Sequence, residues 1–183
     1  MFLVGFMGAG KSSVGRALGE RLNWIFEDLD DRIERRAGRS VPEIFRAAGE
    51  SGFRRLEHDV LRDLLAELRS GGRIIALGGG AFVQANNAAL LKRSGVPTIF
   101  LDATVDELWR RCCTQAQEAG AERPLLGSPE QFRKLYQNRR RRYGRASLTI
   151  STSRRRVDEI AAEITRALGL KPIAIRVEQG ELE

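Results

Sequence analysis

The sequence predicts an α/β fold in which helices cover a mostly parallel sheet of five strands. Short apolar segments alternate with amphipathic helical stretches along the chain, which is the pattern of strand–helix–strand units with right-handed crossovers. The first apolar segment leads directly into a glycine-rich turn and then into a helix. A chain of 183 residues with 42% apolar content has enough material for one core. We therefore expect a single domain.

Each expected strand is short, apolar and bounded by turn residues. The five strands are predicted to begin at Met1 and to span 25–31, 73–77, 97–101 and 148–150. Helices are predicted from about Lys11, with an amphipathic stretch over 14–22, and over 32–68, 85–94, 105–113, 129–142 and 157–168. Residues 173–177 are a further apolar segment, which either adds an edge strand or belongs to a disordered tail at 171–183.

The helical block between the second and third strands is too long for a simple crossover helix. Glycine-containing breaks at 38–40 and 49–52 divide it, and Ser40 with Glu43 favours a new helix start after the first break. We interpret about residues 31–69 as an inserted helical subdomain that covers one side of the site. As a charge pair, Arg54 and Arg55 are expected on its solvated surface. The expected core stripe consists of Phe45, Phe53, Leu56, Val60, Leu61, Leu64 and Leu65.

The turn after the first strand carries a phosphate-binding pattern. Gly5, Gly10, Lys11 and Ser12 fit G-x-x-x-x-G-K-[ST], in which backbone N–H groups surround a phosphate. The lysine of this pattern reaches the β and γ oxygens, the serine hydroxyl ligates Mg²⁺, and the helix N-terminus adds positive potential. A plain glycine-rich turn is the alternative, but it does not require a Lys-Ser pair at this place. The pattern therefore predicts nucleotide binding.

Two further groups of residues follow strands and are expected near this turn. Asp28 and Asp30 end the second predicted strand, where residues two apart point the same way. Ligands of open α/β sheets bind at the carboxyl ends of the strands. The alternative is that Asp30 or Asp31 caps the next helix, and both roles can coexist. The glycines at 78–80 follow the third strand, where a ligand can approach the backbone or a loose turn can form.

Composition limits the function further. The net charge of +7 comes mostly from arginine and predicts an anionic partner, such as nucleic acid, a membrane surface or a phosphorylated or carboxylated small molecule. His58 is the only histidine, which excludes Ser-His-Asp and Cys-His triads, and we expect it on the surface. Cys112 and Cys113 are adjacent and lack metal-ligand spacing, so we expect a reducing cytoplasm. We expect neither a membrane span nor a signal peptide.

Residues 114–129 interrupt the helical periodicity and contain Gly, Pro and Glu, as a mobile lid does, so a lid is predicted over about 113–128. Taken together and in this order, the motifs resemble shikimate kinase over nearly the whole chain to about residue 168. The motifs that carry the resemblance are residues 5–12, Asp28-x-Asp30, Phe53-Arg54, Gly78-Gly79-Gly80, Arg123-Pro124-Leu125 and Arg139 four residues before Tyr143.

The resemblance implies a three-layer P-loop fold over residues 1–170 with sheet order 2-3-1-4-5, in which the 31–69 insertion binds substrate. It implies transfer of the γ-phosphate of ATP to the 3-hydroxyl of shikimate, which gives shikimate 3-phosphate in the pathway to chorismate and aromatic amino acids. Mg²⁺ is the implied cofactor, and the implied enzyme is a cytoplasmic monomer that binds neither nucleic acid nor membrane.

The resemblance also assigns the site residues. The implied catalytic residues are Lys11, Asp30 and Arg123, with Asp30 as the base or the orienting group for the acceptor hydroxyl. ATP would be bound by Gly8, Ala9, Gly10, Lys11, Ser12, Ser13, Arg111, Arg123 and Arg155, and the metal by Ser12 and Asp28. Shikimate would be bound by Asp30, Arg54, Gly78, Gly79, Gly80 and Arg139, with the two arginines on its carboxylate.

The chain departs from the family pattern at two places. The lid segment 114–122 is longer than usual, and Ser151 and Ser153 replace the acidic or Asn residues common in the adenine loop. Three other functions stay open: a related kinase for gluconate or a nucleoside monophosphate, a nucleic-acid-binding NTPase using the arginines at 139–142 and 154–156, and a regulatory NTP switch. The arginine run would spread around a helix, which disfavours a nucleic-acid stripe.

Overall fold

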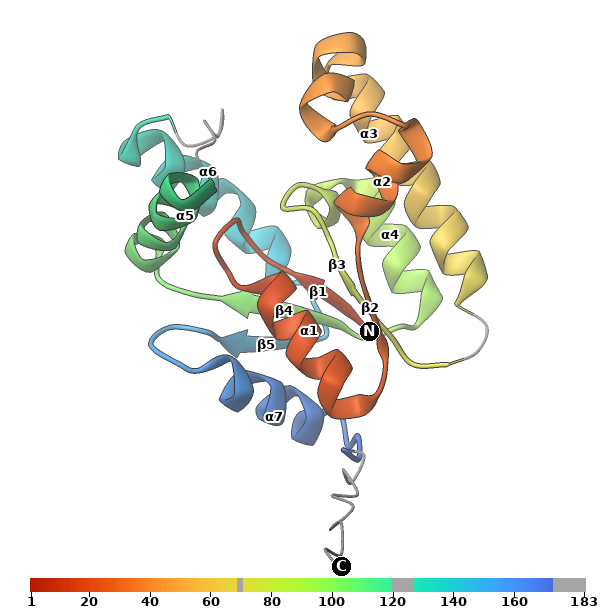
Figure 1. Ribbon diagram of the computed structural model, residues 1–183, viewed down its shortest axis with the longest axis vertical. Coiled ribbons are helices and arrows are strands. Elements are labelled where there is room, and N and C mark those ends of the chain that lie inside the picture. The colour runs from red at the N-terminus through yellow and green to blue at the C-terminus, as the bar shows by residue number, and fades with distance from the viewer. Residues whose placement is uncertain (69–70, 120–126, 173–183) are drawn as a thin grey trace, which may run out of the picture.

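The computed structural model describes residues 1–68, 71–119 and 127–172. One five-stranded sheet runs through the molecule in the order β2-β3-β1-β4-β5, and all four strand pairs are parallel (Figure 1). The predicted architecture and strand order are therefore confirmed. The strands are β1 (Phe2–Val4), β2 (Ile25–Asp28), β3 (Arg73–Ala76), β4 (Thr98–Asp102) and β5 (Leu148–Ser151).

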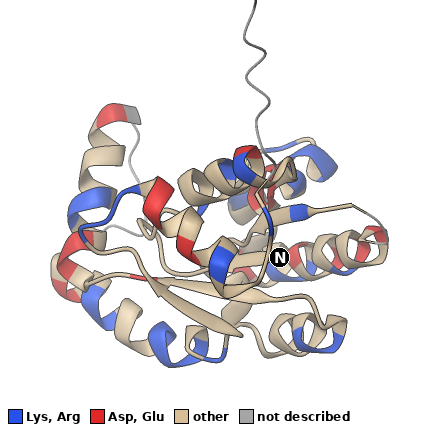
Figure 2. Cartoon of the chain, turned by 90° about the horizontal axis from the view of Figure 1, so that it is seen from below, with Lys and Arg blue, Asp and Glu red and all other residues tan. Residues whose placement is uncertain are grey.

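Helices lie on both faces of this sheet (Figures 1 and 2). Among the helices, α1 packs against α7 and α4 packs against α3. The short helix η1 packs against α6. The helices are α1 (Lys11–Leu22), α2 (Leu29–Ala37), α3 (Val41–Glu67), η1 (Ala81–Val83), α4 (Ala85–Ser94), α5 (Val105–Ala119), α6 (Pro129–Tyr143) and α7 (Val157–Ala167).

The core is built on the three central strands. Leu3 of β1, Ile75 of β3 and Ile99 of β4 are all fully buried. Strands covered on both faces consist of continuous apolar residues instead of alternating ones, which explains these short runs. Figure 2 accordingly shows most strand residues in tan, whereas charged residues lie mainly on the helices and their ends.

The start of α2 differs from the prediction. The strand predicted over 25–31 ends at Asp28, and the helix begins at Leu29, three residues earlier than Arg32. The cap is Asp28, not Asp30 or Asp31, because its carboxylate accepts a hydrogen bond from the Asp30 amide at 3.0 Å. Asp30 therefore lies in the first turn of a helix, and the expected extended arrangement of the two carboxylates is wrong.

The long helical block has one real break and one kink. Gly38 ends α2 in the left-handed region at φ 63°, as predicted, whereas the second break is confined to Gly49, at φ 65°, inside α3. Six of the seven residues of the expected core stripe are buried or packed against the core, and the exception is Phe45. The prediction that Phe45 belongs to the core is wrong, because 36% of its surface is exposed.

The helix α5 continues to Ala119, so the first part of the predicted lid is helical instead of irregular. The segment CTQAQEA after Cys112 consists largely of residues that tolerate or favour a helix, which explains the longer element. Arg123, Pro124, Leu125 and the apolar segment 173–177 lie outside the described residues. Among the residues that are described, no helix is both long and apolar enough to cross a membrane.

Candidate active site

The turn between β1 and α1 is shaped by glycines that other residues could not replace. Gly8 and Gly10 have φ of 77° and 88°, in the left-handed region. A Cβ on Gly8 would lie 2.7 Å from the Leu108 carbonyl oxygen and 2.9 Å from Cys112 Sγ, so the turn packs tightly on α5. Gly10 is the N-cap of α1 and has no side chain to occupy the free N–H groups of the first helical turn. These groups suit an anion such as phosphate.

The ammonium group of Lys11 lies inside this turn. Its Nζ donates to the carbonyl oxygens of Gly5 and Phe6, at 3.1 Å each. Burial lowers the pKa of Lys11, and the nearby carboxylates of Asp28 and Asp30 oppose that shift. Lys11 is thus a positive charge held at the centre of the phosphate-binding turn.

Ser12 and Asp28 face each other beside the turn. The Ser12 hydroxyl donates to Asp28 Oδ2 at 3.2 Å, while Asp28 Oδ1 is the oxygen that caps α2. In the described part of the chain no group of three or more His, Cys, Asp and Glu side chains could hold a metal by itself. Two oxygen ligands fit Mg²⁺ in nucleotide sites, because that ion takes its remaining ligands from phosphates and water.

Asp30 is the most perturbed carboxylate of the site. Burial, followed by the charge of Asp28, raises its pKa to about 6, while Lys11 and Arg54 act in the opposite direction. Its Oδ1 is buried and has no hydrogen-bond partner among the described residues. A Cβ on Gly78 would lie 2.6 Å from that oxygen, so a glycine is needed there. The carboxylate therefore has a free acceptor site next to the backbone at 78–80.

Arg54 lies on α3 and forms an ion pair with the buried carboxylate of Glu57. Its Nη1 donates to both carboxylate oxygens of Glu57 at 3.0 Å, and its Nη2 lies 3.3 Å from Glu50 Oε1. Burial raises the pKa of Glu57, and the charge of Arg54 opposes the rise. The expectation that Arg54 is solvated surface is wrong, since only 18% of its side chain is exposed, whereas its neighbour Arg55 is exposed.

The helix α6 supplies the second arginine. Arg139 donates through Nη1 to the Gly79 carbonyl at 3.3 Å, and its guanidinium lies 5.9 Å from the centre of the Phe6 ring. Tyr143, one helical turn later, also donates to the Gly79 carbonyl, and burial raises its pKa to about 12. Two side chains of α6 therefore fix the backbone that follows β3.

These side chains meet in one cavity of about 370 Å³, which is within the usual size of small-molecule sites. All of the residues predicted to bind shikimate line it. The full lining is Met7, Asp30, Val41, Phe45, Phe53, Arg54, Glu57, Gly78, Gly79, Gly80 and Arg139. A second cavity of about 360 Å³ lies over the phosphate-binding turn and shares Met7, Asp30, Gly78 and Gly79 with the first. The two cavities therefore adjoin.

The sequence prediction missed several residues of these cavities. Glu57 stands three residues after Arg54, a spacing that places both on one helix face and was the available signal. Phe45 stacks on Phe53 with ring centres 4.5 Å apart, which explains why an exposed aromatic lines the cavity. Gln115 lines the second cavity but was assigned to the lid. Ser13 also lines that cavity, whereas Ala9 is buried in the turn.

Arg111 and Arg155 line neither of the two cavities. Arg111 bridges the turn and the loop after β5, since it donates to the carbonyl oxygens of Gly8 at 3.3 Å and Thr152 at 2.8 Å. Its Nη2 also pairs with Glu107 at 2.5 Å. Arg155 pairs with Glu163 at 2.5 Å and donates to the Ser151 carbonyl at 3.1 Å.

The chain matches the family model described as shikimate kinase over residues 7–169. It is 41% identical to a shikimate kinase of Symbiobacterium thermophilum over 170 residues, which is 91% of this chain and 94% of that protein. It is 37% identical to a shikimate kinase of Cereibacter sphaeroides over 180 residues, or 97% of this chain and 86% of that protein.

Solved structures agree with these matches. The shikimate kinase from Acinetobacter baumannii in complex with shikimate superposes with a TM-score of 0.80 at 35% identity and covers 91% of this chain and 90% of its own. A gluconokinase from Sinorhizobium meliloti reaches a TM-score of 0.56 at 17% identity, which shows a shared fold alone. The resemblance found in the sequence is confirmed: this chain belongs to the shikimate kinase family.

Proposed function

We propose that the chain transfers the γ-phosphate of ATP to the 3-hydroxyl of shikimate, giving shikimate 3-phosphate on the route to chorismate and aromatic amino acids. The observation that carries the proposal is one cavity in which Arg54, Arg139 and the unpartnered oxygen of Asp30 meet, next to the phosphate-binding turn. Membership of the family supplies the identity of the acceptor.

The nucleotide half of the reaction uses the turn and its lysine. The N–H groups of Gly8, Ala9, Gly10 and the first residues of α1, including Ser13, bind the phosphates of ATP. Lys11 exchanges its two carbonyl bonds for phosphate oxygens and neutralises the charge that develops on the γ-phosphate. Ser12 and Asp28 would hold Mg²⁺, which when bound neutralises phosphate charge and orients the phosphate chain.

The acceptor half of the reaction depends on opposite charges at two ends of one cavity. Arg54 and Arg139 bind the carboxylate of shikimate through forked, charge-assisted hydrogen bonds. Asp30 accepts a hydrogen bond from the acceptor hydroxyl through its free Oδ1. With a pKa of about 6, Asp30 is mostly ionised at neutral pH and can act as base or orienting group.

Three further assignments belong to the proposal. Arg123, in a lid spanning about 113–128, would approach the transferring phosphate and help to exclude water. Arg111 and Arg155 would border the adenine site, and the contacts of Arg111 with Gly8 and Thr152 support a position between the phosphate-binding turn and the loop after β5. The residues at 31–69 would act as the acceptor-binding insertion.

We also propose a cytoplasmic monomer. Cys112 and Cys113 are adjacent in the chain, which places them poorly for a bond to each other and supports a reducing compartment. The arginine run at 139–142 is partly occupied within the fold, because Arg140 pairs with Asp102 at 2.8 Å and Arg142 donates to the Val83 carbonyl at 3.3 Å. This arrangement supports binding of small anions over binding of nucleic acid.

A coupled assay of ADP release with Mg-ATP, with and without shikimate, tests the function. We expect strong shikimate-dependent turnover in the unmodified chain and its near-complete loss in Asp30→Asn. Gluconate and nucleoside monophosphates serve as control acceptors. Turnover with a control acceptor but not with shikimate would overturn the proposed acceptor, and ATP hydrolysis faster than transfer would favour a regulatory NTP switch.

A further inference from the structure

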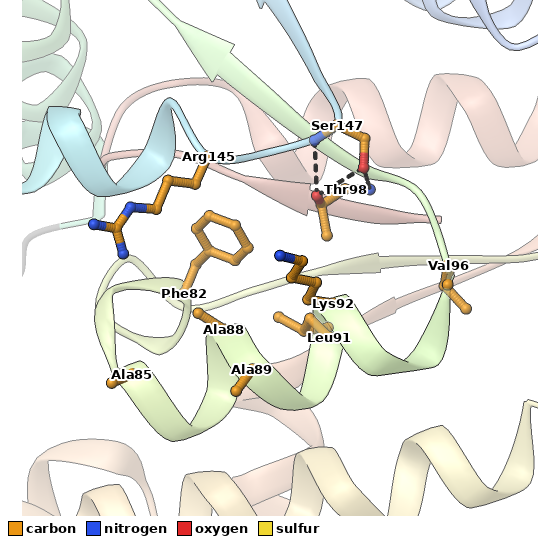
Figure 3. A pocket seen from close by; sticks show the side chains of 11 residues that line it. Phe82, Ala85, Ala88, Ala89, Leu91, Lys92, Val96, Thr98, Arg145 and Ser147 are labelled. Carbon is orange, nitrogen blue, oxygen red and sulfur yellow. Dashed lines mark hydrogen bonds between the residues drawn. The ribbon is translucent and has the colours of Figure 1, made fainter.

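A cavity of about 660 Å³ lies away from the candidate active site and exceeds either of its two cavities (Figure 3). It is bounded by α4, by η1 and by the turn that joins α6 to β5. It shares no lining residue with the phosphate-binding cavity or the acceptor cavity. Its properties are therefore not explained by the proposed reaction.

One wall of this cavity is apolar. Phe82 and Leu91 are buried, with 4% and 1% of their surfaces exposed, and alanines of α4 continue the wall. In Figure 3 the Phe82 ring projects from η1 into the space between α4 and the α6–β5 turn. Phe82 and Leu91 therefore form the floor of the cavity, and the more exposed alanines of α4 give the apolar surface on which a flat group can lie.

Two exposed cations lie at this wall. Lys92 and Arg145 line the cavity, and no hydrogen bond or ion pair joins either side chain to another of the described residues. By contrast, Arg140 and Arg142, which precede the same turn, are both engaged. Figure 3 shows the Lys92 ammonium pointing toward the Phe82 ring, with Arg145 on the other side of that ring.

Two hydroxyls complete the lining. Thr98 Oγ1 and Ser147 Oγ lie 3.3 Å apart, and the Ser147 amide donates to Thr98 Oγ1 at 3.1 Å. A hydroxyl has one donor and two acceptor positions, so this pair can still bind a polar substituent. None of the 11 lining residues is acidic.

We propose that this cavity is a second small-molecule site, for an anion that carries its carboxylate or phosphate on a flat apolar ring. The ring lies on the α4 alanines above the buried Phe82, and the anionic group is bound by the exposed ends of Lys92 and Arg145, which can turn toward it from the two sides of the Phe82 ring. A zwitterion is disfavoured, because the lining offers no carboxylate to its ammonium group. The site does not depend on the proposed function.

Calorimetric titration of the full chain with benzoate and with phenyl phosphate tests this site. Lys92→Gln and Arg145→Gln should each weaken binding about fivefold, the usual scale for one exposed charge contact. Arg93→Gln is the matched control, because Arg93 is exposed on the same helix and does not line the cavity. Ala89→Phe, at an exposed position of the lining, should fill the cavity and abolish binding without loss of the fold.

Three results would overturn the proposal. The first is the absence of saturable binding of either probe. The second is displacement of the bound probe by shikimate or ATP, which would place it in the candidate active site. The third is unchanged affinity in either the charge variants or Ala89→Phe, with circular dichroism confirming that each variant is folded. Because the readout is binding and not turnover, failure of this site is distinguishable from failure of the proposed kinase activity.

Discussion

Arg54 donates from a single nitrogen to both carboxylate oxygens of Glu57, and this pair forms one wall of the acceptor cavity. The Glu57 side chain is 1% exposed, whereas Glu50, which contacts the same guanidinium, is 69% exposed. Removal of one partner of a buried ion pair leaves the other charge buried and uncompensated, so that side chain moves. Exposed ion pairs contribute little to stability. Glu57 is therefore the residue that fixes the direction of Arg54.

Replacement of Glu57 by Gln should impair acceptor binding. The amide keeps the volume of the side chain but breaks the two-oxygen contact, so Arg54 loses its fixed orientation toward the shikimate carboxylate. We expect the KM for shikimate to rise about tenfold with a smaller change in kcat, the scale of one charge-assisted hydrogen bond. Steady-state kinetics with saturating Mg-ATP measures both constants.

Glu50→Gln is the control for that variant, and its KM should change less than about twofold, because exposed pairs are worth little. Circular dichroism and thermal unfolding establish that both variants are folded. A lower KM in Glu57→Gln would contradict the positioning role, since it would mean that the Glu57 charge competes with the substrate carboxylate for Arg54.

The loss of activity at low pH should follow the protonation of Asp30. Burial raises the pKa of this carboxyl to about 6, and only the ionised form can accept the hydrogen bond of the acceptor hydroxyl. We expect kcat/KM for shikimate to fall about tenfold per pH unit below about pH 6. A profile that stays flat down to about pH 5, at which ordinary surface carboxylates are still ionised, would exclude this role.

The same carboxylate should lower the stability of the folded chain. Because the folded state binds the Asp30 proton more tightly than the unfolded state, the penalty develops as pH rises from about 4 through about 6 and is complete at neutral pH. A rise in pKa from 3.8 to about 6 corresponds to at most about 3 kcal/mol. Asp30→Asn should therefore raise the free energy of unfolding at about pH 7.5 by up to that amount.

Urea unfolding of both proteins at about pH 7.5 and about pH 5 measures the difference. Its size should fall to about half at the lower pH, where Asp30 is largely protonated in the folded chain. Other titrating groups are common to both proteins and cancel in the comparison. A stability difference independent of pH would show that the carboxyl is not strained, and the variant would then act through packing alone.

Local patterns of apolar residues and glycines were sufficient to predict five parallel strands and the phosphate-binding turn, whereas the strand order came from the family resemblance. Most of the acceptor cavity could be predicted only through the family resemblance. From charge alone Arg54 belongs on the surface, and the acid that holds it, Glu57, carries no motif. The environment of Asp30 depends on the approach of Gly78 from the turn after β3, which no local pattern contains.

The wrong predictions for the start of α2 and for the burial of Phe45 also come from contacts that local patterns do not contain. An aspartate near a strand end is compatible with a strand residue, a cap or a ligand, and the choice of Asp28 as cap depends on where β2 leaves the sheet. Phe45 fits the apolar period of α3, yet it lies beyond the Gly49 kink and covers the cavity instead of the core. Periodicity identifies an apolar face but does not say what packs against it.

Replacement of Gly80 by alanine should weaken substrate binding while leaving the stability of the fold almost unchanged. Gly80 has φ of −103°, so alanine is allowed there, but its Cβ would lie 2.4 Å from Arg54 Nη2. The clash involves the flexible end of a side chain, which can move aside at small cost to the fold. Since Arg54 would then leave the position held by Glu57, we expect the KM for shikimate to rise about tenfold or more, again the scale of a lost charge-assisted contact.

Gly144→Ala provides the comparison for that variant. Gly144 also has an ordinary φ, −62°, and its Cβ would have no neighbour closer than 3.7 Å. Both variants should unfold within a few degrees of the unmodified chain, since neither creates backbone strain, while only Gly80→Ala should lose acceptor affinity. Equal KM values in the two variants would mean that Arg54 does not bind the acceptor, because the atoms nearest to the added methyl group all belong to its guanidinium.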